Sequence, residues 1–257
     1  MKQFHSRYDG DHKSIYIVFL GDIHYGNKYH DPRLVERVFE FIDRNRKRCR
    51  LVLMGDLMEV ATKTSVGRSV YDESYPTQRQ FEIAVEQFKP YADLIDLVIE
   101  GNHEERIIRD TSFEIIQEFC HRIGRYDAYG QFSGVVNYCL SSNLTYSLYA
   151  WHGATGGTRE TSVVNALLGM RERCIAHIYA MGHTHKLLSF NREVRIPAPG
   201  QPELAVIQQM FVNTGTAVRD GGYGEQKGLP TNRIGFGAVQ IFADERKQVF
   251  HYIDDLL

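Results

Sequence analysis

The first two thirds of the chain alternate continuous apolar runs with amphipathic stretches. A continuous apolar run is typical of a strand buried on both faces, whereas apolar positions three and four apart predict a helix with one buried side. The predicted strands are 15–20, 51–54, 94–99 and 175–181. The predicted helices are 31–47, 76–89, 112–122 and 160–173. Asp31 and Pro32 suit the N-cap and the first position of the first helix.

After Gly124 the pattern becomes richer in strands. Two of them, 135–140 and 144–151, are expected to be joined by a turn at Ser141-Ser142-Asn143. The last third is predicted to contain the strands 186–196, 204–212, 234–242 and 249–253. A β-α-β-α-β-α order followed by further strands predicts an α/β sandwich with mixed sheets. The length of 257 residues fits a single domain, 1–257.

The composition indicates which kinds of partner the protein binds and where in the cell it is expected. A formal net charge of −2 does not favour nucleic-acid binding by bulk electrostatics, although a local basic patch stays open. The basic stretch 44–50 suits the C-terminal end of the first helix, at the sheet edge away from ligand sites. The four cysteines lack CxxC spacing, so we expect reduced thiols in a cytoplasmic protein. The apolar runs are too short for a membrane span, and we expect no membrane partner.

Side chains that commonly bind metals follow five of the predicted strands. They are Asp22 and His24, Asp56, Asn102 and His103, His152, and His183 and His185. In a mostly parallel sheet the carboxyl ends of the strands gather at one edge, which is where sites form. Glycine precedes four of the five sets and permits a sharp turn or a close approach of a ligand.

Each of these residues also has an ordinary explanation as a turn, cap or buried polar residue. Agreement at five strand ends favours a joint site instead. Oxygen and imidazole donors without a thiolate suit Mn, Fe or Zn. Eight such residues are too many for one tetrahedral ion, and they suit two ions that share a bridging carboxylate and lie about 3.5–4 Å apart.

Taken in order, these motifs resemble those of the calcineurin-like metallophosphoesterases, and within them the bacterial and phage branch that is similar to DNA-repair exonucleases. The motifs are Gly21-Asp22-x-His24, Gly55-Asp56, Gly101-Asn102-His103-Glu104, His152 and Gly182-His183-x-His185. The resemblance implies a four-layered α/β/β/α sandwich with two facing mixed sheets. It also implies two bound divalent metal ions, with Mn expected first and Fe, Zn, Ni or Mg as alternatives.

The resemblance further implies a role for each motif residue. The first ion would be bound by Asp22, His24 and His185. The second would be bound by Asn102, His152 and His183, and Asp56 would bridge the two. His103 would protonate the leaving group or stabilise its charge, and Glu104 would orient His103. Arg106 would contact a substrate phosphate, or else lie exposed on the turn after His103.

Such a family implies hydrolysis of a phosphoester by a hydroxide that bridges the metals. Gly55-Asp56 does not continue into the Asp-Arg-Gly of protein serine/threonine phosphatases, which argues against that class. We expect a phosphodiesterase or nuclease acting on nucleic acid, either DNA or RNA, or on a nucleotide. The alternatives are a phosphomonoesterase and a non-catalytic scaffold that binds a partner protein. Arg159, and Arg219 with Tyr223 in the Gly-rich loop 213–233, either line the cleft or are ordinary surface residues.

Overall fold

The computed structural model describes the chain except for residues 9, 11, 64, 66–72, 142–143, 155, 158, 222–224, 226–227 and 229–230. Three residues singled out in the sequence, Ser142 and Asn143 of the predicted turn and the aromatic Tyr223, lie outside the described residues.

Three parallel strands in the first half of the chain run to the same edge of a sheet. They are β2 (Ser14–Leu20), β3 (Cys49–Leu53) and β4 (Ile95–Ile99). The helices α1 (Pro32–Arg44), α2 (Thr77–Phe88) and α4 (Ile115–Ile123) lie between or after them. Helix α1 begins where the sequence predicts, because the Asp31 carboxylate accepts hydrogen bonds from the backbone N–H groups of Arg33 and Leu34.

The structure adds three elements that the hydrophobic pattern does not predict. They are β1 (Lys2–Arg7), α3 (Asn102–Thr111) and β5 (Tyr129–Gln131). Strand β1 is polar and mostly exposed, so its sequence lacks the apolar run on which the other strands were recognised. Helix α3 ends at Ser112, whose φ of 59° is left-handed, and the helix predicted from 112 therefore begins only at Ile115.

The second half of the chain is mostly β-structure, as predicted. Its strands are β6 (Ser133–Ser141), β7 (Leu144–Trp151), β8 (Ile178–Met181), β9 (Leu187–Ile196), β10 (Ala205–Thr216), β11 (Gly235–Phe242) and β12 (Gln248–Tyr252). Among the described residues of this second half, α5 (Glu160–Gly169) is the only long helix, as the sequence indicated.

The strands follow one continuous path, β1-β6-β7-β8-β10-β11-β2-β3-β4-β5, with β9 beside β10 and β12 beside β11. The path divides naturally into sheet I (β2–β5, β11 and β12) and sheet II (β1 and β6–β10). The two sheets are joined where β10 meets β11 through only two residue pairs, Gly215 with Phe236 and Thr216 with Gly235. We expected two facing sheets, and the structure shows that they are linked by this short ladder.

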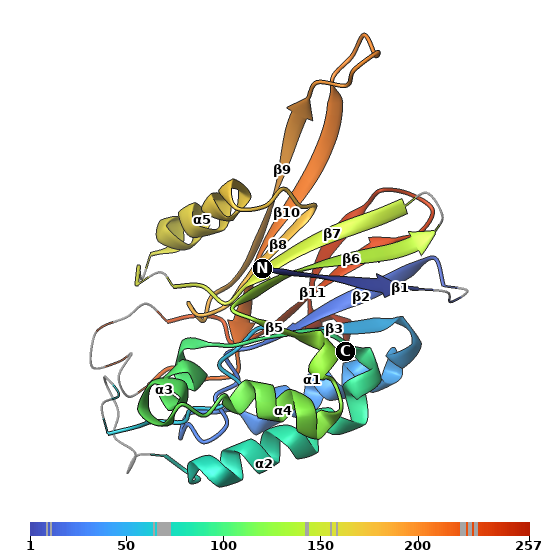
Figure 1. Ribbon diagram of the computed structural model, residues 1–257. Coiled ribbons are helices and arrows are strands. Elements are labelled where there is room, and N and C mark those ends of the chain that lie inside the picture. Colours follow the sequence, from blue (N-terminus) through green and yellow to red (C-terminus); the bar gives the residue numbers. More distant parts are fainter. Residues whose placement is uncertain are drawn as a thin grey trace.

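Three apolar cores hold the layers together. The first lies between sheet I and helices α1, α2 and α4, and the second lies between the sheets, with Phe19 of β2 and Tyr138 of β6 fully buried. The third packs α5, through Val163 and Leu167, on the outer side of sheet II. Figure 1 shows α1–α4 beside sheet I and α5 beside sheet II. The predicted mixed α/β fold is confirmed.

Among the described residues, no helix combines the length and the apolar character that crossing a membrane requires.

Candidate metal centre

The predicted ligands lie together where five strands end. Asp22 follows β2, Asp56 follows β3, Asn102 opens α3 directly after β4, His152 follows β7, and His183 and His185 follow β8. Strands β2, β3 and β4 are mutually parallel, and β7 and β8 are parallel to each other. Their carboxyl ends therefore bring ligands from both sheets to one edge of the molecule.

The backbone of the ligand turns is strained. Among the described residues eight non-glycine positions have positive φ, and five of these are predicted ligands. They are Asp22 (49°), His24 (55°), Asp56 (49°), His183 (68°) and His185 (57°). Such angles are uncommon for residues with a Cβ and persist only where the surrounding structure enforces them. The fold thus holds these side chains in place at a conformational cost.

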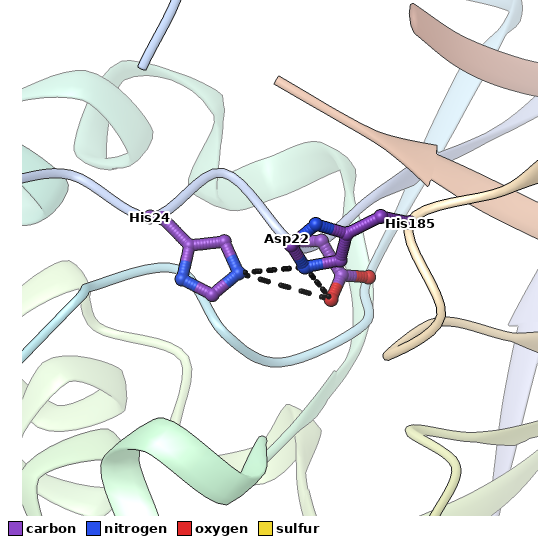
Figure 2. A group of neighbouring side chains, drawn as sticks. All are labelled: Asp22, His24 and His185. Atoms are coloured by element: carbon purple, nitrogen blue, oxygen red, sulfur yellow. Dashed lines mark hydrogen bonds and ion pairs between the residues drawn. The ribbon is translucent and has the colours of Figure 1, made fainter. Parts of the chain in front are cut away.

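The first cluster contains Asp22, His24 and His185, whose side chains point toward one another in Figure 2. The Nε2 atoms of His24 and His185 are 3.0 Å apart. Oδ1 of Asp22 lies 3.4 Å from Nε2 of His185 and 4.0 Å from Nε2 of His24. Two imidazole nitrogens and a carboxylate oxygen that converge in this way form a donor set suited to a divalent cation.

The second cluster contains Asn102, His152 and His183. Oδ1 of Asn102 lies 2.6 Å from Nδ1 of His183 and 3.1 Å from Nε2 of His152. Oδ2 of Asp56 lies 3.3 Å from Nε2 of His152 and 3.8 Å from Nε2 of His24. The Asp56 carboxylate therefore lies between the two clusters.

Glu104 fixes the turn that carries Asp56. Its fully buried carboxylate accepts hydrogen bonds from the backbone N–H groups of Asp56 (2.9 Å), Met58 (3.1 Å) and Gly101 (3.0 Å). We expected Glu104 to orient the His103 ring, but its carboxylate binds these backbone N–H groups instead. The carboxylate reaches backbone amides because Glu104 lies at the third position of α3, where a side chain folds back on the helix start.

The His103 ring is held by a different group. Its Nδ1 is 2.8 Å from the backbone oxygen of Glu59, and because a carbonyl only accepts, Nδ1 carries the proton. Its Nε2 lies 3.9 Å from Oδ2 of Asp56 and 3.0 Å from Nη2 of Arg106. Burial lowers the pKa of His103 to about 4. Arg106 thus lies against His103, within reach of the centre.

Glu59 belongs to the centre although the sequence analysis did not select it. Its buried Oε2 lies 3.1 Å from Nδ1 of His24 and accepts a hydrogen bond from Nδ2 of Asn27 (2.8 Å). A carboxylate behind a ligand histidine fixes the ring and raises its basicity. The signal in the sequence was an acidic residue three positions after Asp56, in Gly-Asp-Leu-Met-Glu.

Opposite charges within the clusters shift the pKa values of their partners toward the charged forms. Burial lowers the pKa of His152, but the carboxylates of Asp56 and Asp22 outweigh it and raise that pKa to about 10. Burial also opposes the charged form of His24, yet Glu59 and Asp56 raise its pKa to about 8. The pKa of Asp56 lies well below its ordinary value, because His103 and His152 outweigh its burial. A cation that binds here therefore competes with protons for the ring nitrogens.

Two other arginines named in the sequence analysis do not join the clusters. Arg219 donates from Nε to Oδ2 of Asp31 (2.8 Å), so it ties the loop after β10 to the start of α1. Arg159 is an exposed residue at the N-cap of α5.

The family model described as calcineurin-like phosphoesterase matches residues 15–200, a span that contains every residue of both clusters. The chain belongs to the calcineurin-like phosphoesterase family. No protein of curated function matches it in sequence.

Solved structures with a similar arrangement include three proteins of low sequence identity to this phosphoesterase. A predicted phosphoesterase from Streptococcus pneumoniae TIGR4 is 17% identical, with 94% of this chain and 91% of that chain covered and a TM-score of 0.39. A metallophosphoesterase from Sphaerobacter thermophilus is 11% identical (93% and 88% covered, TM-score 0.43). GAP50, the anchor in the inner membrane complex of Plasmodium, is also 11% identical (93% and 85% covered, TM-score 0.46). At these values the likeness carries no argument about activity.

Replacing Gly55 by alanine is expected to destabilise the phosphoesterase by about 2–6 kcal/mol, since a left-handed backbone and overpacking each cost about 1–3. Gly55 has φ +84°, and a Cβ there would lie 2.5 Å from the backbone nitrogen of Gly101. Gly124→Ala is the matched control, because Gly124 has φ +77° with nothing within 4 Å of its Cβ position. Urea unfolding should separate the two, and equal losses would show that the contact with Gly101 is unimportant.

Proposed function

We propose that this phosphoesterase is a two-metal hydrolase that cleaves a phosphodiester in a nucleic acid or nucleotide. The observation that carries the proposal is the position of Asp56, whose Oδ2 has His152 at 3.3 Å on one side and His24 at 3.8 Å on the other. One carboxylate between two nitrogen-rich donor sets is the arrangement that a bridged pair of divalent ions requires.

In this proposal the two clusters hold one ion each. Asp22, His24 and His185 would hold the first, Asn102, His152 and His183 the second, and Asp56 would contact both. The ions, when bound, would neutralise phosphate charge and lower the pKa of a water molecule. Oxygen and imidazole donors suit Mn, and also Fe and Zn. The preference for a phosphodiester rests on the motif resemblance, and a cytoplasmic location rests on four free cysteines.

His103 is proposed to act on the leaving group. Because Nδ1 donates to the Glu59 backbone, Nε2 is left on the side of Asp56 and Arg106, and once it is protonated it would donate to a leaving-group oxygen. Arg106 places a guanidinium beside that nitrogen, and a guanidinium binds phosphate oxygens bidentately. The two side chains lie one helical turn apart on α3, which keeps them in register.

His103→Ala is expected to lower kcat by about 10²–10⁴-fold, the usual contribution of a positioned proton-transfer group, while both ions stay bound. The assay compares bis(p-nitrophenyl) phosphate with p-nitrophenyl phosphate, using metal-stripped protein to which Mn, Fe, Zn, Ni or Mg is returned. His121→Ala is the control, because His121 stacks on Tyr126 at the surface (4.2 Å between ring centroids) and should leave kcat unchanged.

The same assay separates the alternatives. Cleavage of the monoester alone would replace the phosphodiesterase by a phosphomonoesterase. No turnover with any metal, despite two bound ions per chain, would favour the non-catalytic scaffold.

A further inference from the structure

Strands β9 and β10 form an arm that stands clear of the body. Their antiparallel ladder runs from Leu187 with Thr214 to Ile196 with Ala205. Strand β8 pairs with β10 only from Met210 to Asn213, so the outer part of β10 has β9 on one side and no strand on the other among the described residues. Figure 1 shows this outer part extending well beyond the other strands of sheet II. The segment 205–208, the free edge, therefore exposes backbone hydrogen-bonding groups.

The two edges of the arm differ in their protection. The outer strand β9 carries Arg192, Glu193 and Arg195, and charges of this kind block pairing with another strand. The free edge reads Ala-Val-Ile-Gln, with neither a charge nor a proline. Val206 is 50% exposed and the adjacent Leu204 is 55% exposed. An uncharged, apolar and exposed edge is the kind that proteins cover with another strand.

The charges near the arm suit a second copy in antiparallel register. The tip carries Glu203, and the base of β10 lies against the loop after α5, since Nε2 of Gln209 donates to the backbone oxygen of Ala176. That loop follows Arg171 and Arg173, and Nε of Arg171 has no hydrogen-bond partner among the described residues. A cavity of about 490 Å³, lined in part by Arg171 and Arg192, opens there. Two antiparallel arms would place each acidic tip beside the other's basic base.

We propose that the free edge of β10 pairs antiparallel with the same edge of a second copy, which makes a two-fold dimer with a four-stranded arm. An antiparallel pairing of identical edges is self-complementary and closes, because the same residues face each other across the axis. The charged edge of β9 stays on the outside and prevents further addition of strands.

Sedimentation velocity over about 1–100 µM, where an interface of standard size is populated, should show a dimer of the wild-type chain. Val206→Lys is expected to weaken the association at least 100-fold or so, because the two-fold axis brings the like charges together. Asn191→Lys, which adds the same charge to exposed β9, is the matched control and should leave the dimer intact. A monomer throughout, or equal weakening by both variants, would overturn the proposal.

Two further measurements test the register. Cysteine placed singly at 205, 206, 207 and 208 should self-cross-link with one clear maximum, at the residue on the axis. Glu203→Arg should weaken the dimer, and adding Arg173→Glu in the same chain should restore it. Equal cross-linking at all four positions, or no restoration by the second charge change, would contradict the antiparallel arrangement.

Discussion

Replacing Asp56 by asparagine is expected to lower kcat/KM by about 10³-fold, because even the partners behind a metal ligand contribute 10–100-fold each. The reason is the position of its carboxylate between the two clusters, 3.3 Å from His152 and 3.8 Å from His24. Asparagine keeps an oxygen that can accept from the backbone N–H of His103 (2.9 Å), so the turn should survive. Elemental analysis should show fewer than two ions per chain, alongside the kinetic loss.

The control is Asp127→Asn, which changes an exposed carboxylate paired with Arg125 and should alter neither metal content nor rate. A variant of Asp56 that retains two ions and full activity would remove the bridging role and, with it, the main support for the two-metal proposal.

Glu104→Ala is expected to lower stability by about 3–9 kcal/mol, because three buried N–H groups would lose their acceptor and each such loss costs about 1–3. Those groups belong to Asp56, Met58 and Gly101. Thermal unfolding should show a fall in Tm of about 10–30 °C, at roughly 3 °C per kcal/mol for a protein of this size. Metal affinity should also fall, by about 10–100-fold, since the turn of Asp56 loses its support.

Two further variants test whether the loss of stability comes from the hydrogen bonds of the Glu104 carboxylate. Glu104→Gln keeps one carbonyl oxygen and should cost clearly less than alanine, and it remains informative if the alanine variant does not fold. Glu105→Ala removes the neighbouring half-buried carboxylate, 3.8 Å from Nε of Arg109, and should change stability by no more than about 0.5 kcal/mol. Similar losses for Glu104→Ala and Glu105→Ala would mean that the backbone contacts of Glu104 contribute little.

The strands that lead to the centre could be predicted because burial on both faces leaves a continuous apolar run, as in β2 and β3. The clustering of Asp22, Asp56 and His183 followed from topology alone, since parallel strands end at a common edge. Strand β1 could not be recognised in the same way. It is exposed at the sheet edge and is held by its ladder with β6, a contact between residues more than a hundred positions apart.

The supporting side chains were harder to assign than the ligands. Glu59 reaches His24 only because the chain after Asp56 folds back, through left-handed backbone at Asp56 and again at Val60 (φ 38°). No local pattern predicts that path. The contact of Glu104 with Gly101 was within reach of sequence reasoning, because an acidic residue three positions after an N-cap is a recognised helix start.

Because the junction between β10 and β11 is narrow, bound cations would form a second connection between the two sheets. Among the described residues, sheets I and II share only two strand-paired residue pairs there, yet each cluster draws donors from both sheets. Asp22 and His24 come from sheet I and His185 from sheet II, while Asn102 from sheet I meets His152 and His183 from sheet II. Coordination of two cations would therefore cross-link the halves of the molecule. How cooperatively the two halves unfold would then depend on the concentration of free metal ions as much as on the sequence.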